Sequence, residues 1–309
     1  QAERPASAAD ERPQGMTDGS GVVKPRFLIA AFWALLAAAS FAVMMASVRY
    51  MDGKFDAFEI VFFRALIGVF IVIPLVTKSG FTALRTDRLP MHVVRTLFAL
   101  FAMATLYYAL AFIPVAQAVA LTFLIPLFTT IAAGTVLREK VGVHRWGATL
   151  VGFGGALIII RPGIVDISLP ILMVVLSSAL YAGAWSSVKI LTRTDSAAVT
   201  VFWMNLLMVP LTAIPLFFVW VTPGPEDILP IVIMALSGWA AHFCQAQAFE
   251  FADASALMPF DFLRLPLGAL FGYLLFAEFI DGWTWAGAVV IFLAGYYITR
   301  REALRKPAG

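Results

Sequence analysis

Charged residues and cysteine are both scarce in this chain. Only 13% of the 309 residues are charged, whereas 61% are hydrophobic, and a soluble globular protein has about a quarter charged residues. A soluble fold of this composition could not cover its surface with polar groups, so the excess apolar surface is expected to face lipid. The single cysteine, Cys244, excludes an intrachain disulfide, and its place in an apolar run predicts a small buried side chain.

Motifs for catalysis, metal binding and ATP-driven pumping are also missing. The sequence contains no GxxxxGK[ST] loop, no HExxH and no GxSxG. Its three histidines, His92, His144 and His242, are too scattered to suggest a metal site. The basic residues occupy short loops and form no single patch. We therefore predict that the protein is not an enzyme, and that it has no cofactor, no metal site and no nucleic-acid partner.

Long apolar runs dominate what is present. About 20 apolar residues cross the hydrocarbon core of a bilayer as a helix. The runs lack the polar–apolar alternation of barrel strands, so helices are predicted. Ten runs are found, at residues 27–48, 58–76, 93–112, 115–136, 143–160, 169–188, 197–220, 228–249, 254–276 and 283–298.

The basic residues predict the orientation of these ten spans. Both ends of the chain are assigned to the cytoplasm, because sixteen basic residues then lie inside and only Arg49, Lys54 and Arg161 lie outside. The inside set is Arg4, Arg12, Lys24, Arg26, Lys78, Arg85, Arg88, Arg138, Lys140, Arg145, Lys189, Arg193, Arg300, Arg301, Arg305 and Lys306. An odd number of spans would destroy this asymmetry.

The two halves of the chain resemble each other at an offset of about 140 residues. Residues 47–49 match 187–189, and residues 73–75 match 214–216. Further along, Glu139, Trp146, Phe153, Ile159 and Arg161 match Glu278, Trp285, Phe292, Ile298 and Arg300. Each half holds five spans, and five is odd, so the second half must be inverted relative to the first. Inverted repeats are typical of secondary transporters.

The predicted fold is therefore an all-α integral membrane protein with ten transmembrane helices in two inverted five-helix repeats. The first repeat covers residues 27–162 and the second covers residues 163–301. A polar, disordered cytoplasmic tail is expected at residues 1–26, and a second cytoplasmic tail at residues 302–309.

The chain resembles the EamA-type ten-span members of the drug/metabolite transporter superfamily over about residues 27–301. In each half, a run of small residues leads through a proline to a glutamate and a Gly/Ala-rich last helix. The matching positions are 116–118, Pro126, Glu139 and 152–155 in the first half, and 254–256, Pro266, Glu278 and 287–295 in the second. The resemblance implies a cavity lined by spans 1, 3, 4, 6, 8 and 9, in proteins that move amino acids, vitamins, nucleotide derivatives or drugs.

Charges inside the predicted spans need a reason, because each costs about 3 kcal/mol on insertion scales. Asp261 and Arg264 are three residues apart on span 9 and can pair. They are interpreted either as a neutral structural pair or as a substrate-binding pair, with Asp261 as a proton carrier the third alternative. Arg64 on span 2 is expected to have a structural role, with a helix end or Glu59 as its partner, and Arg95 to extend toward the cytoplasmic interface.

The candidate substrate-binding residues combine aromatic walls with a few polar groups. They are Tyr107, Gln117, Tyr181, Trp185, Trp239, His242, Gln245, Asp261 and Arg264. Such a lining suits a ligand with a flat or apolar body and one charged or hydrogen-bonding end better than a sugar, because unpaired buried hydroxyls are costly.

The predicted function is secondary transport of a small organic metabolite across the bacterial inner membrane by alternating access. A channel or scaffold without carrier activity, and an intramembrane enzyme, are the alternatives. The expected partners are the small-molecule substrate and the lipid bilayer, with proton coupling and a homodimer left open.

Overall fold

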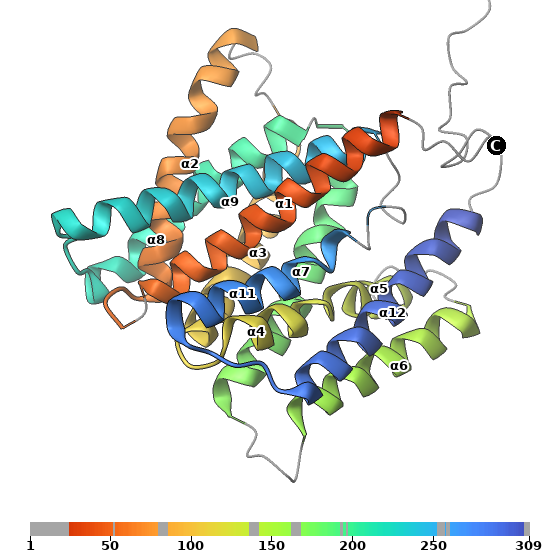
Figure 1. Ribbon diagram of the computed structural model, residues 1–309. Coiled ribbons are helices and arrows are strands. Elements are labelled where there is room, and N and C mark those ends of the chain that lie inside the picture. The colour runs from red at the N-terminus through yellow and green to blue at the C-terminus, as the bar shows by residue number, and fades with distance from the viewer. Residues whose placement is uncertain are drawn as a thin grey trace, which may run out of the picture.

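Helices make up all the regular structure in the part of the chain that is described. The computed structural model describes residues 25–51, 53–79, 86–135, 142–161, 168–191, 194–195, 197–251, 257 and 260–305. Figure 1 shows these helices packed against one another. The all-helical prediction is confirmed for these residues. The tails predicted at residues 1–26 and 302–309 lie mostly outside them.

The helices follow the predicted apolar runs. The first half contains α1 (Pro25–Tyr50), α2 (Ala57–Ser79), α3 (Leu89–Leu110), α4 (Val115–Thr122), α5 (Ile125–Thr135) and α6 (Val143–Ile160). The second half contains α7 (Leu169–Leu191), α8 (Ala197–Val219), α9 (Pro225–Phe251), α11 (Arg264–Phe276) and α12 (Gly282–Arg305). Each predicted run therefore includes described helical residues.

Membrane-spanning length and apolarity are found in several of these helices. Within the described residues, six are long and apolar enough to cross a bilayer, at Phe27–Tyr50, Leu89–Leu110, Val115–Ala132, Leu169–Val188, Val199–Val219 and Pro225–Gln245. Trp146–Ile160, Arg264–Phe276 and Gly282–Ile298 are shorter apolar helices. The chain is thus a multi-pass membrane protein, and the number of ten spans stays a prediction.

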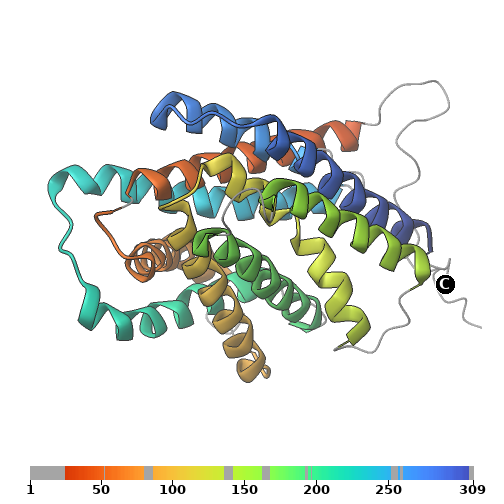
Figure 2. The ribbon, with the colours of Figure 1, turned by 90° about the horizontal axis from the view of Figure 1, so that it is seen from below.

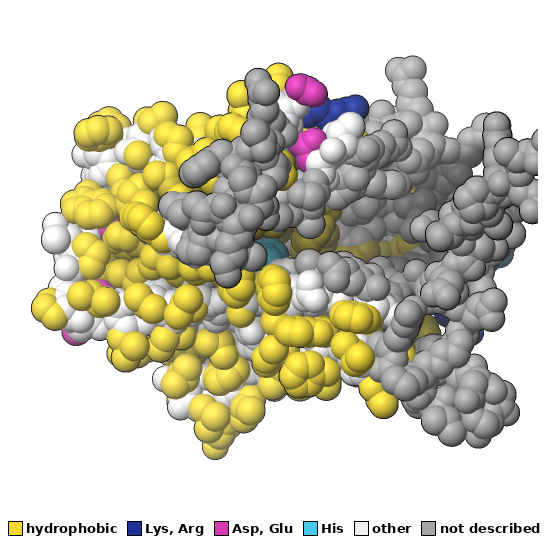
Figure 3. Space-filling model, turned by 90° about the horizontal axis from the view of Figure 1, so that it is seen from above, with side chains coloured by type: hydrophobic (Ala, Val, Ile, Leu, Met, Phe, Trp, Pro, Cys, Tyr) yellow, Lys and Arg dark blue, Asp and Glu magenta, His cyan; other side chains and the backbone are white. Residues whose placement is uncertain are grey.

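The outer surface is apolar, as a surface in contact with lipid must be. Phe217 and Phe218 of α8 are each 88% exposed, and Leu150 of α6 is also exposed. Figure 3 shows hydrophobic side chains over much of the visible face of the described residues. In water such a continuous apolar surface would drive aggregation.

Hydroxyl side chains in the helix interiors form hydrogen bonds within their own helices. Ser47, Thr96, Ser187 and Thr212 each donate to the backbone carbonyl four residues earlier, at 2.7–2.9 Å. Such bonds remove the cost of an unpaired hydroxyl in a water-poor interior. These polar residues therefore need no functional explanation.

Helices of the first half pack mainly against helices of the second half. The most extensive pairs are α1 with α9, α3 with α7, α6 with α12, and α2 with α8, and α4 also packs against α11. Figures 1 and 2 show α6 and α12 side by side in both views. Gly155 and Gly287 allow this approach, because a Cβ on Gly155 would lie 2.8 Å from the carbonyl oxygen of Gly287.

Two helical segments that the predicted repeat would match are interrupted beside a proline. In predicted span 4 the helical run breaks at Phe123 and Leu124, between α4 and α5, and α5 then starts one residue before Pro126. Span 9 has a turn at Phe262 and Leu263, and α11 then starts two residues before Pro266. Proline is tolerated in the first turn of a helix, where its missing N–H has no intrahelical acceptor. Pro259 lies outside the described residues.

An ion pair between Arg49 and Glu278 joins four helix ends. The Nε atom of Arg49, at the end of α1, lies 3.2 Å from Oε1 of Glu278, just after α11. Nη1 of Arg49 also donates to the carbonyls of Leu110 and Ala111 at the end of α3. Glu278 Oε2 accepts the N–H of Val115 at the start of α4, 2.9 Å away. Each charge sits at the helix end that it stabilises, with the cation on carbonyls and the carboxylate on an N–H group.

Candidate functional site

A cavity lies among the helices at the junction of the two halves. It holds about 640 Å³ of space between protein atoms, part of it open to solvent. Side chains from α1, α2, α3, α4, α5, α7, α9 and α11 line it. Apart from α2, these helices correspond to the spans that the family resemblance implies.

Aromatic side chains form much of the cavity wall. Tyr107 of α3, Tyr181 and Trp185 of α7, and Phe41 of α1 all line it. Tyr107 is buried and its hydroxyl donates to the sulfur of Met44 at 3.9 Å, whereas Trp185 is 43% exposed. The wall therefore offers flat apolar surface with few hydrogen-bonding groups, which suits a planar ligand.

Arg264 connects three elements at the cavity. Its Nη2 atom pairs with Oδ1 of Asp261, which confirms the predicted pairing, and also donates to Oε1 of Gln245 on α9 at 3.2 Å. Its guanidinium carbon lies 3.9 Å from the ring centroid of Phe41 on α1, within the range of a cation–π contact. Asp261 neutralises the charge of this group, and Gln245 and Phe41 fix its position.

Arg64 and His242 form a second polar group in the same cavity. Nη2 of Arg64, on α2, lies 3.5 Å from Nε2 of His242, on α9. Arg64 is 5% exposed, and both residues line the cavity. The His242 ring meets Phe41 edge-on, with centroids 5.3 Å apart, so Phe41 contacts both polar groups.

Only some of the predicted site residues line the cavity. Tyr107, Tyr181, Trp185, His242 and Arg264 line the cavity, and Gln245 and Asp261 contact Arg264. Gln117 and Trp239 are not among the lining residues. The Trp239 ring instead stacks on Phe243, with centroids 5.0 Å apart. None of these positions tests substrate binding, so the set stays a prediction.

Arg64 is the lining residue that sequence reasoning assigned elsewhere. A helix end or Glu59 was the expected partner of Arg64. Glu59 accepts the backbone N–H of Val221 at 3.1 Å, and the two side chains form no ion pair. The signals in the sequence were a charge about two turns into an apolar run and a resemblance to an arginine common in the EamA-type members.

A third polar cluster lies at the start of α3, apart from the cavity. His92 Nε2 is 2.7 Å from Oδ2 of Asp195, in the loop between α7 and α8, and the hydroxyl of Thr86 donates to the same oxygen at 2.6 Å. Burial acts to raise the pKa of Asp195, but hydrogen bonds from Thr86, His92 and Thr194 outweigh it, so the net pKa is lowered. The cluster joins α3 to the α7–α8 loop.

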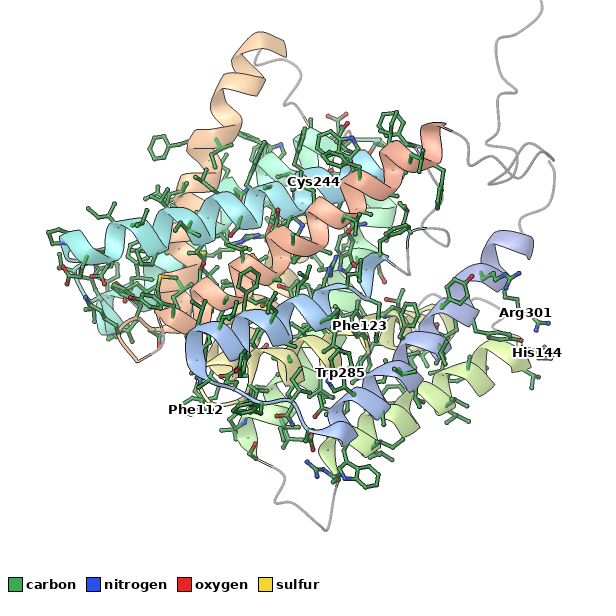
Figure 4. The ribbon with its side chains drawn as sticks, in the orientation of Figure 1. Phe112, Phe123, His144, Cys244, Trp285 and Arg301 are labelled. Carbon is green, nitrogen blue, oxygen red and sulfur yellow. The ribbon has the colours of Figure 1, made fainter. Side chains whose placement is uncertain are left out.

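These arrangements can bind a solute but offer no evident chemistry. Within the described residues, no group of three His, Cys, Asp or Glu side chains could hold a metal ion. Cys244, labelled on α9 in Figure 4, is buried, and burial without an activating partner gives an inert thiol.

Comparison with known proteins identifies the family. A sequence model of the EamA-like transporter family matches residues 28–161 and again residues 168–300. The chain belongs to this family. It is accordingly a membrane transporter and not an enzyme.

Named relatives of this transporter align with most of its length. It is 33% identical to a riboflavin transporter of Vibrio cholerae over 91% of this chain and 96% of the relative. It is 34% identical to a riboflavin transporter of Brucella anthropi over 79% of this chain and 88% of the relative. It is 30% identical to an S-adenosylmethionine uptake transporter of Rickettsia prowazekii over 87% of this chain and 92% of the relative.

A solved crystal structure shares the fold of this transporter. It superposes with a TM-score of 0.59 over 90% of this chain and 98% of its own chain, at 18% sequence identity. At this identity the likeness shows the fold alone.

Proposed function

We propose that this transporter is a secondary carrier for riboflavin, or for a similar flat metabolite, in the bacterial inner membrane. The observation that carries the proposal is a cavity with aromatic walls and two guanidinium groups, in a chain whose relatives include riboflavin transporters. Tyr107, Tyr181 and Trp185 can stack on a planar ring system, and Arg64 and Arg264 can donate to its polar edge.

Charge favours riboflavin over S-adenosylmethionine, which a relative of similar identity transports. The sulfonium centre of S-adenosylmethionine carries a fixed positive charge, which the buried guanidinium of Arg64 in the cavity wall would repel. Among the described residues near the cavity, Asp261 is already paired with Arg264, and no carboxylate lines the cavity wall. A neutral ring with carbonyl oxygens meets no such penalty.

We further propose ten spans with both termini in the cytoplasm. Ion pairs support this topology, because they join segments predicted on the same side. Nη2 of Arg161 lies 2.5 Å from Oδ2 of Asp281, and Nζ of Lys54 lies 2.6 Å from Oδ2 of Asp227. All four residues belong to loops predicted to lie outside. The His92–Asp195 pair joins segments predicted inside. Figure 4 also places His144 and Arg301, both predicted inside, at one end of the α6–α12 pair.

The helix pairing supports the inverted repeat. A pseudo-twofold axis that exchanges residues 27–162 with 163–301 would exchange α1 with α7 and α3 with α9. It would then turn the α1–α9 contact into the α7–α3 contact, and both are main packing pairs. The pairs α2–α8, α6–α12 and α4–α11 would each map onto themselves. Proton coupling and a homodimer form no part of this proposal.

Counterflow in liposomes tests the proposed function. The purified protein is reconstituted into liposomes loaded with unlabelled riboflavin, and a trace of radiolabelled riboflavin is added outside. A carrier transiently concentrates the label inside, whereas a channel only equilibrates it. S-adenosylmethionine, in the same format, is the control substrate. Accumulation of S-adenosylmethionine but not riboflavin would overturn the proposed substrate and leave the carrier mechanism standing.

A further inference from the structure

Arg64 is a buried cation without a counter-ion among the described residues. No carboxylate of these residues pairs with it, and its buried Nε atom has no hydrogen-bond acceptor. Its one polar contact with another described residue is the 3.5 Å approach of Nη2 to Nε2 of His242. Because a guanidinium carries five N–H donors, most of its hydrogen-bonding capacity remains unused, and the side chain lines the cavity.

Neighbouring charged groups are engaged elsewhere. Glu59, five residues earlier on α2, accepts the N–H of Val221. Asp261 pairs with Arg264. Arg95, on α3, donates to the carbonyl oxygen of Thr200 at 2.9 Å. The second carboxylate oxygen of Glu59, Oε2, has no hydrogen-bond partner, but no ion pair joins it to Arg64. Among the described residues, the surroundings of Arg64 thus add further positive charge and supply no paired carboxylate.

His242 fixes the orientation of the guanidinium. An arginine can only donate, so the His242 nitrogen that faces it must accept, and the ring must be neutral in this contact. Gly238, one turn earlier on α9, makes room for this arrangement. A Cβ at Gly238 would lie 2.9 Å from the Sδ atom of Met44 and 3.3 Å from Nε of Arg64.

We propose that Arg64, oriented by His242, is the subsite that binds an oxygen acceptor of the transported solute. The acceptor is either a carbonyl oxygen at the edge of a flat ring or a carboxylate, since both satisfy a planar guanidinium fork. This inference rests on the proposed carrier function. It specifies that the oxygen-bearing end of the solute binds Arg64, whereas the aromatic side chains contact its flat body. It assigns a substrate-binding role to a residue of α2.

Equilibrium binding to the purified full-length protein tests the subsite with two probes. Riboflavin offers ring carbonyls and no net charge, and indole-3-acetate offers a flat ring with a carboxylate. We expect wild-type protein to bind at least one probe, and Arg64→Gln to weaken that binding at least tenfold. Arg64→Lys, which keeps the charge but loses the fork, should recover it only in part. Gly238→Ala, which crowds both Met44 and the guanidinium but leaves the charge of Arg64, should weaken it severalfold.

Arg95→Gln is the matched control. It also removes a buried guanidinium charge, but its side chain does not line the cavity, so probe affinity should stay within twofold of wild type. If Arg64→Gln fails to give a monodisperse protein, Arg64→Lys and Gly238→Ala carry the test.

The outcomes separate this inference from the proposed substrate. Riboflavin binding that Arg64→Gln and Gly238→Ala leave unchanged overturns the subsite and leaves riboflavin as substrate. Arg64-dependent binding of indole-3-acetate without riboflavin binding supports the subsite and overturns the proposed substrate. Equal losses in Arg95→Gln and Arg64→Gln, or binding of neither probe to wild type, overturn the subsite.

Discussion

Tyr181 and Trp185 lie one helical turn apart on α7 and both face the cavity. Aromatic stacking contributes about 0.5–1.5 kcal/mol beyond simple burial, so we expect Tyr181→Ala and Trp185→Ala each to weaken riboflavin binding about 3- to 10-fold. Fluorescence titration of the purified variants measures the affinity. Tyr108→Ala, on an exposed α3 side chain, should bind as wild type does. Unchanged affinity in both α7 variants, or preferred binding of a hexose, would contradict the aromatic wall.

Removal of either member of the Asp261–Arg264 pair leaves a charge without its partner. We expect Arg264→Ala to lower the transport rate more than tenfold while the protein still inserts, because the contacts with Gln245 and Phe41 also disappear. Asp261→Asn should also slow transport severalfold, because it leaves the guanidinium of Arg264 without its ion-pair partner. Uptake into proteoliposomes measures both. Arg161→Ala, which breaks the ion pair with Asp281 in a loop predicted to lie outside, is the control. Normal transport by both Arg264→Ala and Asp261→Asn would show that the pair has only a structural role.

Asp195 should make the free energy of unfolding depend on pH. Its pKa in the folded protein lies below the ordinary value, so its contribution is present above about pH 4 and is lost as the pH falls through the lower folded pKa. With its side chain 7% exposed, we expect Asp195→Asn to lower the free energy of unfolding by about 1 kcal/mol at pH 7. Thermal unfolding in detergent at pH 7 and pH 3.5 measures the difference. A loss that is as large at pH 3.5, or that also appears in the exposed control Asp87→Asn, would exclude this origin.

Residue spacing predicted some of these contacts and missed others. Asp261 and Arg264 pair because residues three apart share a helix face. Arg64 could not be placed in the same way, because rotation of α2 about its own axis depends on α8 and α9, which pack against it. Trp239 lies at the same three-residue spacing as His242 and Gln245, yet its ring packs on Phe243. Spacing predicts which residues share a helix face but not which neighbours that face contacts.

The ends of α1, α3, α4 and α11 depend on Glu278. Its carboxylate holds Arg49 and the first N–H of α4, so Glu278→Ala leaves a partly buried guanidinium and an uncapped helix end. We expect a loss of about 1–3 kcal/mol in stability, together with slower transport. Thermal unfolding and proteoliposome uptake measure the two effects. Glu226→Ala is the control, because Glu226 is 70% exposed and Lys54 keeps its contact with Asp227; an equal loss there would contradict a special role for Glu278.

Helix positions were largely predictable, whereas helix neighbours were not. Apolar length located the helices, and Pro126 and Pro266 marked the two interrupted ones. The partnership of α1 with α9, or α3 with α7, leaves no periodic signal in a sequence whose helices are apolar on every side. The cavity arises from those partnerships, so its lining could only be approximated through a family resemblance.

The charge distribution predicts which ends of the helices face the cytoplasm. In a Cys244→Ala background, Arg88→Cys and Arg301→Cys should react with a membrane-impermeant maleimide only in inverted vesicles. Glu226→Cys should react only in intact cells or spheroplasts. Positive-inside orientation is the physical reason. Labelling of all three positions from one side would rule out ten spans with both ends in the cytoplasm.

The interlocking of the two halves also governs how the chain must be synthesised. Arg64 enters the membrane 178 residues before His242, its polar neighbour. At about 5–20 residues per second, its guanidinium waits roughly 10–40 s for the helices that enclose it. During this interval α1 and α3 also lack their main partners, α9 and α7. The first half is therefore expected to stay in contact with the insertion machinery until the second half is inserted. A chain that stops after Arg161 should be degraded by membrane proteases.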